Sequence, residues 1–258
     1  MLNEKGEVAD VVFSGVTKRY GKAPPVLDQI DLTVAKGEFV GIIGPSGCGK
    51  STLLKIVSGL TPISAGQVYI DGMSPSNARE IVSYVFQDPT LVPWLTVSRN
   101  IGLGLELEGV SRQRREEKIT SLLSLVNLDH VASAYPRQLS GGMKMRVSIA
   151  RALATRPRIL LMDEPFAALD EMTRDRMNEE LLRLRSEHDW TVLFVTHSVA
   201  EAVFLSTRIV VLAPYPGRIA HDIANPLPSP RTADTRDSSD FEELVTSVSK
   251  TLRGVTLA

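Results

Sequence analysis

Residues 44–51, Gly-Pro-Ser-Gly-Cys-Gly-Lys-Ser, have the spacing of a loop that binds nucleotide phosphates. In this G-x-x-x-x-G-K-[ST] pattern, glycines let backbone N–H groups approach phosphate oxygens closely. Lys50 is placed to neutralise the β- and γ-phosphates, and Ser51 to bind Mg²⁺. A chance match in a glycine-rich turn is the alternative. The residues predicted to bind nucleotide here are Gly44, Pro45, Ser46, Gly47, Cys48, Gly49, Lys50, Ser51 and Thr52.

Two adjacent acids, Asp163 and Glu164, follow an apolar run at 159–162. Acids at the carboxyl end of a strand in an α/β sheet face the crevice where ligands bind. Neighbouring residues of a strand point to opposite faces, so the two acids should have different roles. Asp163 suits Mg²⁺ binding through water, and Glu164 suits polarising an attacking water. A solvated strand end is the alternative, and the phosphate loop makes it the weaker one.

These residues need a scaffold of strands and helices, and short apolar runs alternate with helical patterns along the chain, which indicates an α/β fold. The phosphate loop lies between a predicted buried strand and a predicted helix, the context that its motif requires. Predicted strands are 11–14, 27–34, 39–43, 68–70, 81–86, 159–162, 191–196 and 208–212. Predicted helices are 49–58, 142–155, 171–187 and 198–205.

Two segments depart from this alternation. Residues 88–138 have no strand pattern; prolines and glycines break their first part, and Ser111 then caps a helix, so we predict a helical insertion. From Pro214 onward prolines predict an extended tail. Ser239 and Glu242 have the spacing of a capping box, which predicts a short helix at the end.

Composition is that of an ordinary globular protein, with 258 residues, 43% hydrophobic, 23% charged and a net charge of −1. The near-neutral charge argues against a general nucleic-acid binder. Cys48 is the single cysteine, so no intramolecular disulfide can form, which fits a reducing compartment. No apolar run approaches the roughly 18 residues that cross a bilayer, and the N-terminal stretch has no signal-peptide pattern. We expect any membrane-spanning part to come from another chain.

A second glycine motif, Leu139-Ser140-Gly141-Gly142-Met143, precedes a predicted helix. Bare amides at a helix N-terminus suit a phosphate group, so Ser140, Gly141 and Gly142 are candidate ligands. By itself the motif would be an ordinary serine cap followed by a glycine turn.

With these motifs in this order, the chain resembles the ATP-binding cassette (ABC) family over nearly its whole length. The phosphate loop, the signature 139–143 and the acids 163–164 occur in the family's order. Smaller matches are Gln87 to the glutamine loop, residues 168–170 to the D-loop, His197 to the switch histidine, and Tyr20 to the aromatic that stacks on adenine. Ordinary core packing is the alternative for Tyr20, and a satisfied core histidine is the alternative for His197.

The resemblance implies a P-loop NTPase fold, with a RecA-like core sheet, an antiparallel β subdomain and a helical subdomain insertion. The cassette would span 8–245, with its core at 8–87 and 139–225. The helical subdomain would take about 88–138 plus the start of the signature helix. Residues 226–258 would form a C-terminal extended tail and short helix.

The resemblance also implies roles for site residues. Glu164 would be the catalytic base, His197 would contact the γ-phosphate, Lys50 would bind phosphate, and Gln87 would sense the metal. Mg²⁺ would be held by Ser51, Gln87 and Asp163. ATP would lie between two cassettes, against Ser140, Gly141 and Gly142 of the second chain, with Asp170 linking the two sites.

Several details are similar to importers of the nitrate, sulfonate and taurine type, among them Met143-Lys144-Met145-Arg146 and the segment 87–107. The tail at 227–231 is looser than that branch's usual proline-arginine pattern. The implied partners are a second ATPase subunit, a transmembrane permease and a periplasmic or extracellular solute-binding protein, with no nucleic acid. The implied location is peripheral, on the cytoplasmic face of the inner membrane. Trp94 could dock the permease, with local core packing as the alternative.

Two other functions compete with transport. A soluble ABC ATPase of DNA repair or translation would carry two cassettes, a long coiled coil or basic arms, and none is visible in the sequence. A small-molecule kinase with the same phosphate loop would not need residues 140–142 or His197.

Overall fold

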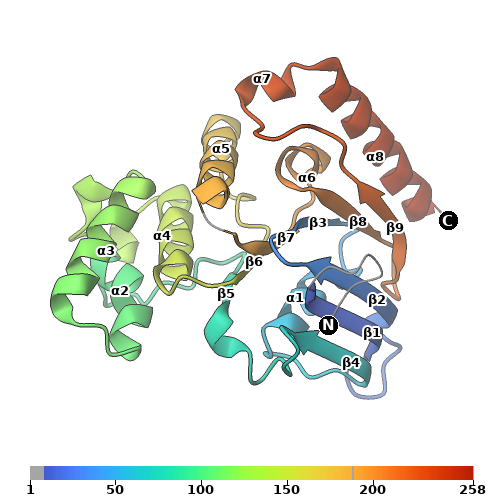
Figure 1. The fold of residues 1–258 in the computed structure, drawn as a ribbon, viewed down its shortest axis with the longest axis horizontal. Helices are drawn as coiled ribbons and strands as arrows, with labels where there is room; N and C mark the ends of the chain where they lie inside the picture. The colour runs from blue at the N-terminus through green and yellow to red at the C-terminus, as the bar shows by residue number, and fades with distance from the viewer. Residues whose placement is uncertain (1–8, 188, 258) are drawn as a thin grey trace.

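The computed structural model describes residues 9–187 and 189–257, and its centre is a six-stranded sheet (Figure 1). In sheet order its strands are β5 (Val82–Val85), β6 (Ile159–Asp163), β7 (Thr191–Val195), β3 (Phe39–Ile43), β8 (Arg208–Leu212) and β9 (Ile219–Ala224). All neighbours are parallel except β8 and β9. A separate antiparallel sheet has the order β2 (Leu27–Ala35), β1 (Ala9–Lys18) and β4 (Ala65–Ile70).

The central strands are buried on both faces, and their alternating side chains enter two hydrophobic cores. In β7, Val192 and Phe194 join one core while Leu193 and Val195 join the other. The second core is completed by α1 (Lys50–Val57) and the antiparallel sheet. The first is completed by helices that include α5 (Glu171–Glu187) and α6 (Val199–Leu205), which lie on the opposite side of the sheet (Figure 1).

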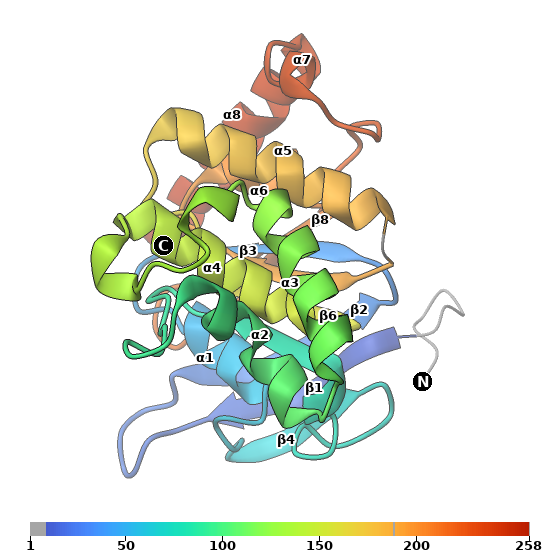
Figure 2. The ribbon, with the colours of Figure 1, turned by 90° about the vertical axis from the view of Figure 1, so that its left-hand side faces the viewer.

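A group of helices stands beside the sheet and faces the viewer in Figure 2. It contains α2 (Val97–Leu107), α3 (Arg112–Leu125), α4 (Gly141–Ala154) and the short 3₁₀ turns Asp129–Val131 and Pro136–Gln138. Together with α4, the predicted helical insertion at 88–138 therefore forms a helical cluster. A further 3₁₀ turn, Arg79–Ile81, leads into β5.

Glycines at 102 and 104 predict a broken segment, and this prediction is wrong, because α2 is a regular helix. A Cβ at Gly102 would lie 2.6 Å from the Ile119 side chain of α3, and one at Gly104 would lie 2.8 Å from the Thr155 side chain. The glycines thus let α2 approach its neighbours closely. Tertiary packing offsets a helix propensity that is about 1 kcal/mol poorer per glycine than for alanine.

The C-terminal region also differs from expectation. Residues 219–224 pair with β8 as strand β9, and α7 (Ala233–Arg236) precedes a 19-residue helix, α8 (Ser239–Leu257), where the pattern predicts a short one. Helix α8 is long because it packs on α6 and buries Phe241 and Val248 in the first core. Its first turn is capped by Ser238 Oγ, which accepts from Phe241 N at 3.3 Å, one residue before the predicted cap. Similarly, Ser111 precedes α3 without a side-chain capping bond.

The remaining predicted elements are confirmed, and β4 begins at Ala65, three residues before its predicted start. The other five strands of the large sheet, and helices α1, α4, α5 and α6, begin and end within one residue of their predicted bounds. Strand β1 is several residues longer than predicted because it pairs with both β2 and β4. Across the described part of the chain, no helix has the length and apolar character that crossing a membrane demands.

Candidate active site

The phosphate loop connects β3 to α1, and the side chain of Lys50 fills its centre. Lys50 Nζ donates to the carbonyl oxygens of Gly44 and Pro45, each at 2.9 Å. Gly49, just before α1, has a φ of 101°, and a Cβ there would lie 2.6 Å from the Leu27 side chain. This position therefore needs glycine. The ammonium group therefore lies inside the loop, where its positive charge suits a phosphate group.

Asp163, the last residue of β6, is joined to the phosphate loop. Ser51 Oγ donates to its Oδ1 at 2.9 Å, and the Tyr84 hydroxyl donates to its Oδ2 at 3.1 Å. Burial raises the pKa of Asp163, and these two hydrogen bonds oppose the rise. The hydroxyl and carboxylate oxygens are hard donors of the type that Mg²⁺ takes alongside phosphate and water. The pair fits a Mg²⁺ site on this chemistry.

Glu164 is the point where three segments meet. Gln87 Nε2 donates to Glu164 Oε2 at 3.2 Å, and His197 Nδ1 lies 3.3 Å from the same oxygen. These residues follow β5, β6 and β7, which are adjacent in the sheet, so their carboxyl ends bring the side chains together. Glu164 has a φ of 48°, a left-handed conformation that costs free energy in a non-glycine residue and is typical of functional sites.

The signature motif lies at the start of α4. Ser140 is the N-cap, and its Oγ accepts from Met143 N at 3.3 Å. Gly142 packs against Leu169, since a Cβ on it would lie 2.8 Å from the leucine side chain. No hydrogen bond between described residues links 140–142 to 44–52. The structure thus does not join the signature and the phosphate loop by hydrogen bonds within one chain.

Tyr20 and Asp170 lie at two further places on this surface. Tyr20 is 49% exposed, with Lys18 Nζ 4.6 Å from its ring centroid, so the core-packing alternative is wrong. His197 has 61% of its side chain exposed, which likewise rules out a buried core histidine. Asp170 caps α5 by accepting from Thr173 N at 2.9 Å, and this bond lowers the pKa of the carboxyl group.

Some residues of the site have no counterpart among the sequence predictions. Tyr84 holds Asp163, as described above. Glu201, in α6, accepts from Thr196 Oγ1 at 2.5 Å and lies 3.4 Å from Arg174. Ser198 and Glu201 have the spacing of a capping box, the one signal that could have drawn attention to Glu201. In the structure the Glu201 carboxylate contacts Thr196 and Arg174 instead of completing the capping box. The contact with Arg174 depends on the packing of α5 on α6, which the sequence pattern does not reveal.

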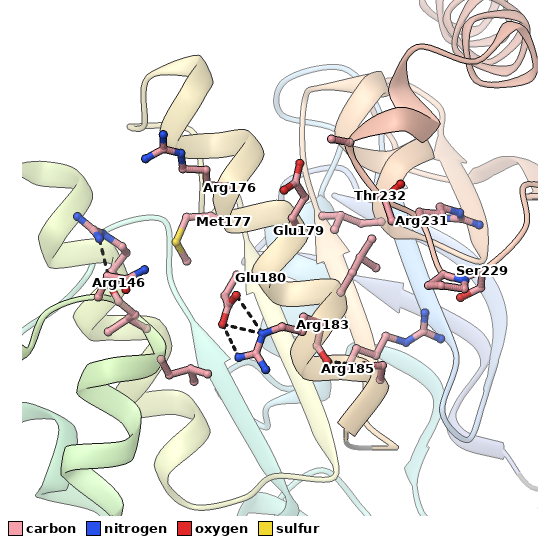
Figure 3. A pocket seen from close by; sticks show the side chains of 18 of the residues that line it. Arg146, Arg176, Met177, Glu179, Glu180, Arg183, Arg185, Ser229, Arg231 and Thr232 are labelled. Carbon is pink, nitrogen blue, oxygen red and sulfur yellow. Dashed lines mark hydrogen bonds and ion pairs between the residues drawn. The ribbon is translucent and has the colours of Figure 1, made fainter.

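A cavity of about 1130 Å³ lies away from these residues, between α5, the end of α3 and the tail at 229–233 (Figure 3). None of the predicted site residues lines it. Glu180 and Arg183 pair on its α5 wall. Arg231 donates to the carbonyl oxygens of Val203, Phe204, Ser206 and Leu227. That side chain therefore fastens the tail to the end of α6.

Comparison with known proteins identifies the family. The family model described as ABC transporter matches residues 27–167, more than half of the chain. The chain belongs to the ABC transporter family. The fold and the order of its motifs are therefore those expected from the resemblance, and the chain is an ABC transporter ATPase, which hydrolyses ATP to drive transport.

Individual relatives are similar over most of their length. The taurine import ATP-binding protein of Rhizobium johnstonii is 45% identical over 215 residues, covering 83% of this chain and 81% of the relative. The aliphatic sulfonates import ATP-binding protein of Bacillus cereus is 42% identical over 237 residues, covering 91% and 92%. A solved dimeric structure of the ATP-binding cassette MJ0796, in a post-hydrolysis state bound to ADP and Pi, superposes with a TM-score of 0.76 at 34% identity. It covers 83% of this chain and 98% of that one.

Proposed function

We propose that this ABC ATPase energises import of a small anion through a separate membrane permease. A sulfonate such as taurine is the first candidate cargo, with nitrate and similar small organic or inorganic anions next. The observation that carries the ATPase part is the convergence of Gln87 and His197 on one carboxylate oxygen of Glu164. The likeness to taurine and sulfonate import proteins supports the cargo class.

The two adjacent acids have different contacts, and we assign them different roles in ATP hydrolysis. Ser51 and Asp163, with Gln87, would hold Mg²⁺, which supplies charge neutralisation on the phosphate oxygens when bound. Glu164 accepts the proton of the attacking water, and His197 orients that water and the γ-phosphate. Lys50 exchanges its two carbonyl partners for phosphate oxygens, a stronger, charge-assisted contact.

The remaining nucleotide contacts complete a shared site. The ring of Tyr20 stacks on adenine, and residues 44–52 surround the phosphates. Ser140, Gly141 and Gly142 of a second copy close the site from the other side, and Asp170 reaches across the interface. The exposure of His197 and Tyr20, and the dimeric form of the MJ0796 structure, support this arrangement.

Trp94 is the candidate contact for the permease. It is 75% exposed, so the alternative of local core packing is wrong. The turn that carries it is rigid, because the buried side chain of Asn100 donates to the carbonyl oxygens of Val92, Leu95 and Thr96 and accepts from Val92 N. A pre-organised aromatic side chain is well suited to a protein interface. Docking here would place the chain peripherally on the cytoplasmic face of the membrane, beneath a permease served by a solute-binding protein.

Movement between two parts would couple the site to the permease. We propose that residues 88–138, with the start of α4, form a subdomain that rotates against the core at 8–87 and 139–225. Residues 226–258 would stay with the core; residue 258, like residue 8 of the core, lies outside the described part of the chain. The close packing of α2 on α3, and of α2 on α4, supports a rigid helical unit.

Growth on a defined sulfur source tests the cargo and the role in import. A strain that lacks this gene should fail to grow with taurine or an aliphatic sulfonate as its sole sulfur source, and the intact gene should restore growth. The Glu164→Gln variant, expressed to the same level, should not restore it. Growth of the deletion strain on every sulfonate and nitrate tested, together with sensitivity to DNA damage or a translation defect, would favour a soluble ABC ATPase instead.

Oligomeric mass tests the shared site. Glu164→Gln should shift from monomer to dimer only when MgATP is present. A chain that binds ATP but stays monomeric would point to a partner cassette of different sequence.

A further inference from the structure

A buried carboxylate lies immediately behind the switch histidine. Glu201 of α6 is 7% exposed, and its Oε2 accepts from Thr196 Oγ1 at 2.5 Å. The same threonine oxygen accepts from the backbone N–H of Ser198 at 3.0 Å. The chain on both sides of His197, residues 196–198, is therefore held by one hydroxyl group whose orientation Glu201 sets. We refer to residues 196–198 as the switch segment.

The other oxygen of this carboxylate connects to the D-loop. Glu201 Oε1 lies 3.4 Å from Arg174 Nε, an ion pair whose geometry falls short of a hydrogen bond. Arg174 Nη2 donates to the carbonyl oxygen of Leu169 at 2.9 Å, and Leu169 packs on Gly142 of the signature. A continuous path of polar contacts therefore runs from the D-loop, through Arg174 and Glu201, to the switch segment.

Because Glu201 is buried, its contacts depend on the charges of Glu201 and Arg174. Desolvation raises the pKa of Glu201, while the Thr196 hydrogen bond and the positive charge of Arg174 oppose the rise. A buried carboxylate is stable only with such partners, and removing one leaves an uncompensated group. Neither Arg174 nor Glu201 contacts Glu164 or the phosphate loop through any hydrogen bond or ion pair of the described residues.

We infer that Arg174 and Glu201 are positioning residues that join the D-loop to the switch segment, so that the placement of His197 on Glu164 depends on the position of the D-loop. This inference rests on the proposed shared site, in which the D-loop touches the second chain. Closure of the interface between the two chains would then change the position of His197 through Arg174 and Glu201 of the same protomer. ATP binding itself uses neither residue.

Steady-state ATPase kinetics of the full-length purified chain test the inference. Glu201→Gln keeps an acceptor for Thr196 but loses the charge that faces Arg174. We expect kcat to fall about tenfold or more with KM for ATP changed less than about twofold, because a misplaced catalytic group affects the transition state rather than substrate binding. Binding of a fluorescent ATP analogue, measured at equilibrium, should match the unmodified chain.

A second variant separates positioning from folding. Arg174→Lys keeps the positive charge but lacks the planar fork that reaches Leu169 and Glu201 together, so kcat should again fall while the thermal midpoint changes little. The double variant Arg174→Lys/Glu201→Gln should be no slower than the slower single variant, because the two residues act as one unit. Fully multiplicative losses in kcat would overturn the inference.

Asp10→Asn is the matched control. Asp10 is 1% exposed, accepts from Thr191 Oγ1 at 2.5 Å and pairs with Arg158 Nη2 at 3.0 Å. Thr191 begins strand β7, whereas Thr196 directly follows the other end of that strand. Asp10→Asn should lower the thermal midpoint and leave kcat within about twofold, since no site residue depends on Asp10. An equal loss of kcat in both variants, or an unchanged kcat in Glu201→Gln, would overturn the inference. These kinetics use the isolated chain, so a failed growth test of the cargo would leave them unaffected.

Discussion

The two ends of strand β7 carry the same three-part arrangement of side chains. At the amino end, Thr191 donates to the buried carboxylate of Asp10, which pairs with Arg158. At the carboxyl end, Thr196 donates to the buried carboxylate of Glu201, which pairs with Arg174. Both hydroxyl-to-carboxylate distances are 2.5 Å.

The surroundings of the two arrangements differ. At the amino end, Arg158 also pairs with Asp71, and Thr191 accepts from Gly37 N, so every contact ties strands and turns together. At the carboxyl end, the next residue is the exposed His197, which lies on Glu164. Parallel strands send their loops and ligand-binding groups to one edge of the sheet. The position in the sheet, more than the side chains themselves, separates a structural cluster from one next to the chemistry.

Loss of the catalytic base should have the largest effect at the carboxyl end. Glu164→Gln keeps the shape of the side chain and removes its capacity to accept a proton. We expect kcat to fall about 10²- to 10⁴-fold while ATP affinity is retained, the range that general base catalysis supplies. Single-turnover hydrolysis and equilibrium nucleotide binding measure the two quantities separately. A kcat above about one tenth of the original value would assign the base to another group.

Loss of the Lys50 ammonium group should weaken ATP binding as well as slow the chemical step. Lys50→Ala removes the ammonium group that now bonds to Gly44 and Pro45, and we expect ATP affinity to fall about 10- to 100-fold. Titration with a fluorescent ATP analogue checks this. Lys55→Ala, five residues further along α1, is the control, and equal weakening in both variants would indicate a nonspecific charge effect.

The two threonines compare the ends of β7 most directly. Thr191→Val and Thr196→Val each remove the hydroxyl donor from one oxygen of a buried carboxylate, whose other oxygen still faces its arginine, and this should cost about 1–3 kcal/mol of folding stability in either case. Only Thr196→Val should also lower kcat, by several-fold, because it alone adjoins His197. Urea unfolding and ATPase assays on both variants give the comparison. A similar loss of kcat in Thr191→Val would contradict the division between the two ends.

Substitution of Trp94, which lies away from both ends of β7, should have the smallest effect on the stability and ATPase activity of the isolated chain. Trp94→Ala changes an exposed side chain on a turn held by Asn100, so stability should change by less than about 0.5 kcal/mol and ATPase activity by less than about twofold. Stimulation of the ATPase by the reconstituted permease should fall. Normal assembly and normal stimulation in this variant would remove Trp94 from the permease contact.

Local patterns were sufficient to predict most of the framework. The continuous apolar run of β3, followed by glycines and Lys50, specifies a buried strand, a loop and a helix within a few residues of each other. Asp163 and Glu164 follow another such run. The glycine-containing helix α2 and the long helix α8 could not be predicted this way, because packing on α3, α4 and α6 stabilises them.

The family resemblance, the phosphate loop, the acidic pair and the strands that carry them could all be predicted from the amino-acid sequence, since each depends on residues close together in the chain. Two arrangements became visible only in the folded chain. Gln87 and His197 contact the same oxygen of Glu164, and the carboxylate of Glu201 contacts Thr196 and Arg174 rather than the N-terminus of its own helix. Those contacts join elements separated along the chain, and their geometry comes from the order of strands in the sheet and the packing of α5 on α6.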